Sequence, residues 1–304
     1  MPNLKKPVKR KERLGLDDKI YYQAVNIVLA LLLISVAYPL IFVVSASLSS
    51  PGAVAAGRVL LLPVEFSLKG YETVFKDPRI ITGYANSIFY TVVGTAISVA
   101  ITVIAAYPLS RREMPFRNGL MMLFTFTMLF GGGMIPNYIL VRDLGMLNTR
   151  WSMLIPGALG VYNMIITRTF FQANIPNELY EAAVLDGCND FKFFGRIVIP
   201  LSGAIIAVIT LFYSLGQWNA FFGPLLYLTD KKLIPLSIIL RDILLANSID
   251  PATVYDPDTQ TAMIGLSDLL RYSLIIVASL PMIMIYPFVQ KYFVKGVMIG
   301  AVKG

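Results

Sequence analysis

The stretch AVNIVLALLLISVAYPLIFVV, residues 24–44, contains no Asp, Glu, Lys or Arg, and it decides the fold class. A helix needs about 20 mostly apolar residues to cross the ~30 Å hydrocarbon core of a bilayer. A helix also satisfies its own backbone hydrogen bonds, which lipid cannot do. The stretch therefore predicts a transmembrane helix near the N-terminus.

Long uncharged windows recur along the whole chain. Windows of at least 17 residues without an acidic or basic side chain are 20–57, 80–110, 118–141, 151–167, 197–229 and 272–290. The fourth is short, and we expect it to continue through Phe170 and Phe171, with Arg168 snorkelling near its end. Only 14% of residues are charged, against about 25% in soluble domains. The sequence predicts an all-α polytopic membrane protein with six transmembrane helices.

The distribution of Lys and Arg predicts the orientation. With the N-terminus in the cytoplasm, 16 of these residues fall on the cytoplasmic side and 10 on the other. The positive-inside rule therefore favours both termini inside. Acidic residues divide 8 inside and 10 outside, so the net charge of +8 belongs to the cytoplasmic face. It indicates contact with anionic lipid headgroups rather than with nucleic acid.

The orientation divides the chain into segments. We expect a cytoplasmic tail at 1–19, a six-helix transmembrane domain at 20–294 and a second cytoplasmic tail at 295–304. The first apolar run is too long for a signal peptide. Residues 230–271 form the longest outer loop. One cysteine, Cys188, and no histidine argue against a disulfide framework, a zinc site and histidine-based catalysis.

One mixed segment, YEAAVLDGCNDFKFFGRIVIPLS at residues 180–202, lies within the cytoplasmic loop 173–200. Pro176 suits a first helical position, and Gly187 suits the turn that ends that helix. Asn189 or Asp190 then caps a second helix, which must end by Pro200. Phe191, Phe193 and Phe194 form an apolar tip that a partner protein would cover. The alternative is that both short helices lie along the membrane interface.

The spacing of this segment resembles a known motif. Glu181–Ala183, Gly187, Ile197, Ile199 and Pro200 match the EAA motif of permease subunits of binding-protein-dependent ATP-binding cassette (ABC) importers, with Ile199 where Leu is usual. The pair Asp186–Gly187 is typical of carbohydrate importers. The stretches LGQWNAFFGPLLYLTD at 215–230 and KYFVKGVMIGAVKG at 291–304 resemble the maltose-type permeases, and 126–149 resembles the branch for complex oligosaccharides.

The resemblance implies a loop between helices four and five that couples the permease to an ATPase. The implied coupling residues are Glu181, Ala182, Ala183, Asp186, Gly187, Phe191, Phe194 and Pro200. A tail that reaches the ATPases is implied at Gly296, Gly300, Lys303 and Gly304. The partners would be a second, non-identical permease, two ABC ATPases and an extracellular sugar-binding protein in the cytoplasmic membrane. The chain has no G-x-x-x-x-G-K-[ST] motif, so ATP and Mg would be bound by those ATPases.

Polar and aromatic side chains inside the spans predict a sugar path, because they are costly in lipid and usually face a cavity or a neighbouring helix. The candidates are Asn86, Tyr138, Tyr162, Asn163, Tyr213, Gln217, Trp218 and Asn219. The alternative is an outer aromatic belt for Trp218 and the tyrosines, and bridges between helices for Asn163 and Asn219. Gly131–Gly133 and Pro136 are expected to break helix three, and Gly83 and Pro108 to mark helix boundaries.

Two other classes of membrane protein compete with this interpretation. An ion-coupled secondary transporter usually places ionisable residues within its spans, whereas these windows have none. A membrane-embedded enzyme would need a catalytic acid, histidine or metal ligand there. We therefore expect no catalytic residue and no metal site in this chain, and a transport subunit rather than an enzyme.

Overall fold

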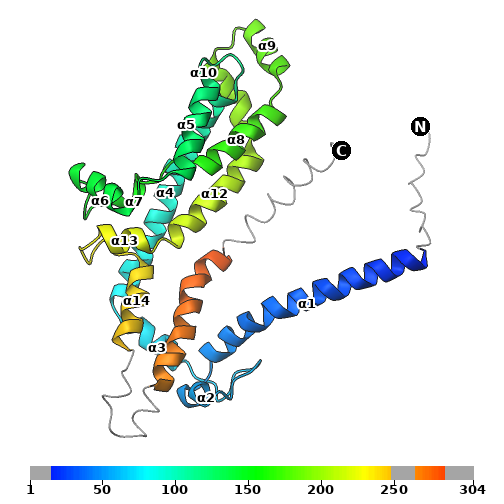
Figure 1. Cartoon of the computed structure of the whole chain (residues 1–304). Coiled ribbons are helices and arrows are strands. Elements are labelled where there is room, and N and C mark those ends of the chain that lie inside the picture. Colours follow the sequence, from blue (N-terminus) through cyan, green and yellow to red (C-terminus); the bar gives the residue numbers. More distant parts are fainter. Residues whose placement is uncertain (1–14, 248–263, 285–304) are drawn as a thin grey trace, which may run out of the picture. The chain divides into compact units, whose positions relative to one another are not determined.

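The computed structural model describes residues 15–247 and 264–284, and its regular elements there are helices without any strand (Figure 1). Three helices are long and apolar enough to cross a membrane, at Asp17–Ser47, Arg79–Ser110 and Ile264–Met284. Two bent helix pairs raise the number to five if each pair counts as one span. The predicted all-α class is confirmed, and the count of six spans stays a prediction.

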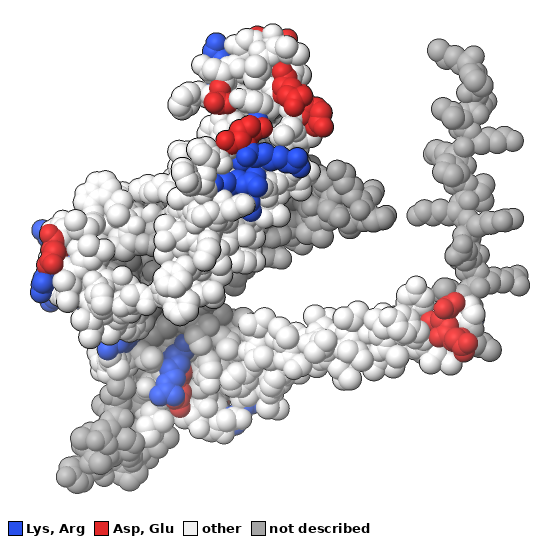
Figure 2. All heavy atoms as spheres, turned by 45° about the horizontal axis from the view of Figure 1, so that its top comes forward, with Lys and Arg blue, Asp and Glu red and all other residues white. Residues whose placement is uncertain are grey.

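The chain divides into two compact units, Met1–Gly70 with Ile249–Ser273 and Tyr71–Ser248 with Leu274–Gly304. In the first unit, α1 (Leu16–Ser47) carries Asp17 and Asp18 in its first turn, where the helix dipole favours negative charge. None of its most apolar window is buried. Figure 2 shows this uncharged surface, white, bare along the helix. Such a helix needs lipid or another protein around it.

Serine hydroxyls fold the chain back after α1. Ser45 Oγ donates to the carbonyl of Leu61 at 2.7 Å, and Ser49 Oγ accepts from the amide of Val64 at 3.0 Å. The short α2 (Pro51–Ala55) is capped by Ser50, whose Oγ accepts from the amide of Ala53. The bond from Ala53 satisfies an amide that the start of α2 otherwise leaves unpaired, and the other two satisfy backbone groups of the loop that follows. The short α3 (Lys69–Phe75) follows.

The second unit is built around α4 (Arg79–Ser110), on which α8 (Val161–Asn174), α12 (Gly203–Trp218) and α14 (Leu236–Ala246) pack. Small residues allow this close approach. A Cβ added at Gly83 would lie 2.6 Å from Ile239 Cδ1 of α14. The prediction that Gly83 marks a boundary is therefore wrong, because it lies inside α4. Pro108 does lie near the end of α4.

A stripe of polar side chains on α4 is buried within this unit. Its members are Asn86, Ser87, Thr91, Thr95, Ser98 and Thr102. From Ser87 onward their spacing is three to four residues, which puts them on one face of the helix, and Asn86 lies beside the first of them. The face that joins α4 to its neighbours is thus polar as well as apolar, as expected where helices associate inside lipid.

The third predicted span is broken. α5 (Arg117–Leu129) and α6 (Met134–Asp143) meet at an angle of 111°. Gly133 between them has φ +88°, which favours glycine. The expected break at Gly131–Gly133 is confirmed, and the window 118–141 is not one straight helix.

The fourth predicted span is also interrupted. The short α7 (Trp151–Leu154) ends well before α8 begins at Val161. Gly157, at φ +74°, lies in the turn that separates them. α8 has 14 residues, about 21 Å at 1.5 Å per residue. The expectation of one helix from residue 151 through Phe171 is wrong, because this turn divides it.

Part of the predicted outer loop 230–271 is helical. α13 (Phe222–Tyr227) precedes it, and α14 (Leu236–Ala246) lies within it. One side of α14 is buried, at Leu236, Ile238, Ile239, Leu240 and Ile243. This part of the loop is therefore packed structure, and residues 248–263 lie outside the described chain.

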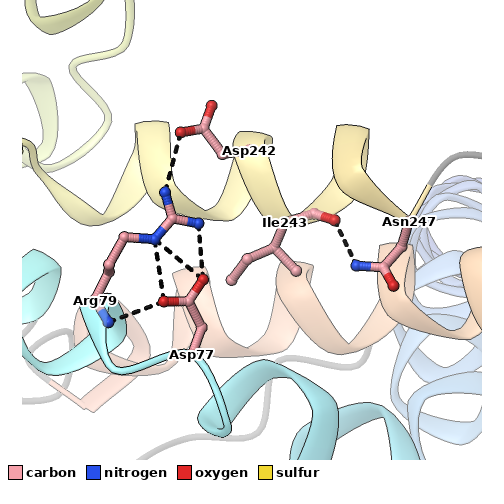
Figure 3. Close-up of polar contacts among 5 residues, drawn as sticks. All are labelled: Asp77, Arg79, Asp242, Ile243 and Asn247. Atoms are coloured by element: carbon pink, nitrogen blue, oxygen red, sulfur yellow. Dashed lines mark hydrogen bonds and ion pairs between the residues drawn. The ribbon is translucent and has the colours of Figure 1, made fainter.

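An ionic contact joins α14 to the start of α4 (Figure 3). The Arg79 guanidinium donates to both carboxylate oxygens of Asp77, with Nη2 at 2.8 Å from Oδ2. Arg79 Nη1 also lies 3.5 Å from Asp242 Oδ2 of α14. The hydrogen bond from Arg79 lowers the pKa of Asp77, so this carboxylate stays ionised well below neutral pH.

Candidate functional site

Loop 173–200 begins with α9 (Asn177–Leu185), which ends in a paired hydrogen-bond motif. The amide of Cys188 donates to the carbonyl of Ala183, and the amide of Gly187 donates to that of Val184, both at 2.9 Å. Gly187 has φ +74°. This is a Schellman motif, in which the residue after the cap adopts the left-handed conformation. The predicted end of this helix at Gly187 is confirmed. Pro176 was predicted to be the first helical residue, but it is the N-cap, which is one position earlier in a helix.

The second half of the loop is a short continuous helix with a wide turn in it. α10 (Asp190–Phe193) is capped by Asn189, whose Oδ1 accepts from the amide of Lys192 at 2.9 Å. A π-helical turn at Phe194–Val198 leads into α11 (Ile199–Leu201). The prediction that this helix ends by Pro200 is wrong by one residue. A π turn is wider than an α turn, so it accommodates the proline ring that otherwise meets the carbonyl four residues earlier.

The loop then meets α12 at a sharp corner. The segment Asp190–Leu201 and α12 lie at 78° to each other. Ser202 at the corner is fully buried, and its Oγ donates to the carbonyl of Val198 at 2.6 Å. Such a bond from a serine to the carbonyl four residues earlier bends helices.

A cluster of side chains joins the end of α4 to both helices of the loop. The guanidinium carbon of Arg111 lies 3.8 Å from the ring centre of Tyr180 in α9. The Tyr180 hydroxyl donates to Asp190 Oδ1 of α10 at 2.9 Å, and its ring packs edge-on against Phe193. The hydrogen bond to Asp190 raises the pKa of Tyr180, so the phenol stays protonated and remains a donor at neutral pH. We call Arg111, Tyr180, Asp190 and Phe193 the loop clamp.

The three phenylalanines have different environments. Phe193 is fully buried, and the Phe194 ring packs at a tilt against the Tyr107 ring with ring centres 4.9 Å apart. Phe191 is 88% exposed, and so is Leu185 in α9, at 89%. The predicted apolar tip of three phenylalanines is therefore wrong. The α9–α10 corner instead exposes Leu185 and Phe191, because the core recruits the other two rings.

Other predicted coupling residues lie on both faces of the loop. Glu181, Ala182 and Asp186 are exposed, whereas Ala183 is buried in the core cluster with Phe193. Beside Phe191 the surface is hollowed into a groove of about 660 Å³ that Met114, Tyr180 and Phe194 also line. An exposed charged face next to an apolar groove suits contact with another protein.

The buried hydroxyl of Tyr213 is a junction of three helical segments. Tyr213 Oη lies 2.6 Å from Thr102 Oγ1 of α4 and accepts from the amide of Gly160, before α8, at 2.9 Å. This hydroxyl is thus bonded to two partners inside the protein. Asn163, also nearly buried, lies one turn along α8.

Gln217 and Tyr213 line a small cavity of about 250 Å³, together with Ser152, Phe212 and Tyr227. The Gln217 amide lies over Gly94 of α4, where an added Cβ would be only 2.8 Å from Nε2. Tyr227 stacks on Tyr138 of α6 with ring centres 6.2 Å apart. Aromatic faces and an amide around one cavity suit the C–H faces and hydroxyls of a sugar.

The remaining candidates of the sugar path have other partners. Asn86 Nδ2 donates to the carbonyls of Lys232 and Ile234 at 2.8 and 3.1 Å. Trp218 Nε1 donates to the carbonyl of Ala278 at 2.9 Å. Asn219 bonds its own helix at Leu215, and Tyr162 is 60% exposed. Asn86 and Trp218 thus bond to backbone carbonyls of distant segments, a role that neither the sugar path nor the aromatic-belt alternative predicts.

The sequence-based predictions missed one set of residues, and another set that they named lies outside the described part of the chain. Arg111, Tyr180 and Leu185 were not predicted, because nothing in the sequence places Arg111 against a ring 69 positions later. A leucine beside the Asp186–Gly187 pair, where the helix ends, has no further helical turn on which the buried face could continue. This position is a weak indication in the sequence that Leu185 is exposed. The predicted tail residues Gly296, Gly300, Lys303 and Gly304 lie outside the described residues.

No family model matches the chain. It is 40% identical over 266 residues to protein LplC of Bacillus subtilis, a match that covers 88% of this chain and 89% of LplC. It is also 40% identical over 272 residues to the polygalacturonan/rhamnogalacturonan transport system permease protein YtcP of that bacterium, covering 88% and 92%. The melibiose/raffinose/stachyose import permease protein MelC of B. subtilis is 26% identical over 248 residues, covering 80% and 84%.

A solved structure has the same fold. The match is to a chain in the crystal structure of a bacterial ABC transporter involved in the import of the acidic polysaccharide alginate. The TM-score is 0.81 and the identity is 34%, and the match covers 92% of this chain and 99% of that chain. The likeness therefore extends over nearly the whole of both chains.

Proposed function

The chain belongs to the permease subunits of carbohydrate ABC importers, and from this premise we propose how it couples to an ATPase and what it carries. It is a transport subunit and not an enzyme, as its relatives are. The alternative of an ion-coupled secondary transporter finds no support among these relatives. The relatives are parts of importers, so this chain also works with an ATPase and a binding protein.

The proposed coupling element is the α9–α10 corner, because it is both exposed and rigidly held. Leu185 and Phe191 present two apolar side chains that are 89% and 88% exposed. Fully exposed large apolar side chains are favourable only when a partner covers them. The loop clamp fixes the corner to α4, so a push on the corner moves the spans instead of bending the loop. Glu181 adds an exposed charge for a polar contact with the same partner.

The test is to place a charge at the corner in the assembled importer. We expect Phe191→Asp and Leu185→Asp each to reduce the amount of ATPase that copurifies with the permease, or to separate ATP hydrolysis from uptake. Leu62→Asp is the control, because Leu62 is also strongly exposed, at 77%, but belongs to the other compact unit. Normal ATPase recovery and normal transport in both corner variants would disprove the assignment.

We propose the predicted topology for the membrane arrangement. Six spans would place both termini and loop 173–200 in the cytoplasm, in the cytoplasmic membrane, as the excess of Lys and Arg on that side supports. A second, non-identical permease would complete the pore, two ATPases would bind ATP and Mg, and a sugar-binding protein would act outside. Cysteine accessibility at Phe191 and Arg142, from each side of sealed vesicles, tests the orientation.

The proposed substrate is an oligosaccharide from an acidic polysaccharide. Two similar proteins are named for polygalacturonan/rhamnogalacturonan transport and for alginate import, and all three polymers contain uronic acids. The candidate sugar contacts in this subunit are Gln217, Tyr227 and Tyr138, around the small cavity. Uptake of labelled galacturonate and alginate oligosaccharides, against neutral maltodextrins, tests this. Transport of neutral oligosaccharides alone would contradict it.

A further inference from the structure

A second cavity, of about 750 Å³, lies where α4 ends and α5 and α9 begin. Arg111, Arg112 and Arg117 line one side of it, and Gln172 and Glu178 also line it. Figure 2 shows basic side chains gathered beside acidic ones at this end of the second unit. Glu181, which we propose as a polar contact with the ATPase, also lines this cavity, and Tyr107 and Arg111 line both the cavity and the groove beside Phe191.

The arginines differ in whether they have an acidic partner. Arg111 belongs to the loop clamp and lies 3.6 Å from Glu113. Among the residues that the structure describes, no carboxylate lies within 4 Å of Arg112 or Arg117. Arg117 Nη1 only donates to the carbonyl of Arg111, at 3.3 Å. Two guanidinium groups at a cavity wall, each with free donors, are suited to a phosphate group.

Two helices point their N-termini at the same cavity. Arg117 is the first residue of α5, and Asn177 is the first residue of α9. Neither helix has a side-chain cap, since the N-cap residues are Phe116 and Pro176. Amides at an uncapped N-terminus, together with the helix dipole, favour an anion. The two guanidiniums and the two helix ends therefore favour the same kind of ligand.

The position of the cavity, at the end of α4, indicates that its ligand is a lipid. α4 has 32 residues, about 48 Å at 1.5 Å per residue, whereas a bilayer with its headgroups is about 40–45 Å thick. The end of α4 at Ser110 therefore reaches the headgroup layer. Phe116, next to the arginines, is 87% exposed and has φ +57°. An exposed ring beside cationic side chains is typical of the membrane interface.

We propose that this cavity binds the headgroup of a membrane phospholipid, with the phosphodiester on Arg112 and Arg117. Glu178 on the other wall then accepts a hydrogen bond from the distal end of the headgroup. Phosphatidylethanolamine fits best, because its ammonium group donates where the choline group of phosphatidylcholine cannot. Basic pockets of this kind between spans bind lipid headgroups.

The test uses the whole importer in nanodiscs of phosphatidylcholine alone or mixed with phosphatidylethanolamine. We expect phosphatidylethanolamine to raise the unfolding temperature and to stay bound after purification, measured by mass spectrometry of extracted lipid. Arg112→Gln with Arg117→Gln is expected to lower the retained lipid roughly tenfold. Glu178→Ala, which removes the acceptor, is expected to remove the preference for phosphatidylethanolamine over phosphatidylcholine. Arg142→Gln, an exposed arginine of α6, is the control and is expected to change neither.

Three outcomes would overturn the proposal. Equal stabilisation by glycerophosphoethanolamine, which has no acyl chains, would assign the cavity to a soluble phosphate ester. Unchanged lipid retention in the double variant would remove the arginines from lipid binding. Loss of the ATPase from the double variant with lipid retention intact would assign the cavity to the ATPase interface. Each outcome is separable from failure of the coupling assignment, which the corner variants test.

Discussion

The guanidinium carbon of Arg111 lies over the ring of Tyr180, 3.8 Å from its centre, and the Tyr180 hydroxyl is bonded to Asp190. The three residues come from the end of α4, from α9 and from α10. One continuous set of contacts therefore joins a long spanning helix to both helices of the coupling loop. Cation–π contacts contribute about 0.5–2 kcal/mol, depending on exposure.

Breaking this contact is expected to uncouple the importer. Tyr180→Leu removes the ring, so α9 loses its attachment to Arg111 and the corner yields when the ATPases close. We expect ATP hydrolysis to continue while sugar uptake per ATP falls severalfold, measured together in proteoliposomes. Tyr180→Phe is the matched variant, since it keeps the ring and loses only the bond to Asp190, and it should have an intermediate effect. An unchanged ratio in Tyr180→Leu would show that the clamp only stabilises the fold.

The contact of Gly83 with α14 predicts a loss of stability when a methyl group is added. Gly83→Ala puts a Cβ 2.6 Å from Ile239 Cδ1 and 3.1 Å from the Leu236 backbone, so α14 must shift. Overpacking of this kind costs about 1–3 kcal/mol. Thermal unfolding of the purified complex measures it. Gly119→Ala in α5 is the control, because nothing lies within 4 Å of that added Cβ, and a control loss as large would refute the packing explanation.

The hydroxyl of Tyr213 is expected to act in stability more than in sugar binding. Tyr213→Phe leaves the Gly160 amide and the Thr102 hydroxyl without this partner in a buried site, which costs about 1–3 kcal/mol. We expect a lower unfolding temperature with little change in the concentration of sugar that gives half-maximal uptake. Tyr162→Phe, at an exposed tyrosine, should leave the unfolding temperature unchanged. A large kinetic effect at normal stability would instead place Tyr213 Oη in the sugar path.

The lowered pKa of Asp77 predicts how one variant depends on pH. Because the folded state lowers this pKa, the Asp77–Arg79 contact stabilises above the unfolded pKa of about 3.9 and is lost as pH falls through the folded value. Asp77→Asn should therefore cost up to about 1 kcal/mol at pH 7, since Arg79 is partly exposed. The difference from the wild type should shrink below about pH 4. Asp143→Asn is the control, because the pair with Arg142 is more than half exposed, and it should change the unfolding temperature little at pH 7.

The sequence predicted the helical class and the local features of the loop well, because these depend on short-range chemistry. The break at Gly131–Gly133, the turn at Gly187 and the cap at Asn189 each follow from the conformation or side chain of one residue. The environments of the three phenylalanines could not be predicted from such short-range chemistry. Neighbours in sequence cannot show that Phe193 packs beneath Tyr180 while Phe191 points outward, since tertiary contacts decide it.

The candidate sugar path was harder to predict for a related reason. A polar residue inside a span has two uses, and only its distant partner distinguishes them. Asn86 meets carbonyls about 146 positions later, and Trp218 meets Ala278. Gln217, by contrast, lines a cavity over Gly94. The periodicity that predicts the helices is the same for all three residues, so it cannot show which of them lines a cavity and which bonds to a distant carbonyl.

The 78° corner at Ser202 makes the second half of the loop and α12 the two arms of a bent lever that turns about Ser202. Its arms, Asp190–Leu201 and Gly203–Trp218, have 12 and 16 residues, so they measure about 18 and 24 Å. A rotation about the corner that moves the α10 end by about 1 Å then moves Trp218 by about 1.3 Å, each at right angles to its own arm, by the ratio of those lengths. Because Trp218 is bonded to the carbonyl of Ala278, this motion passes to Ile264–Met284, the last helix that the structure describes.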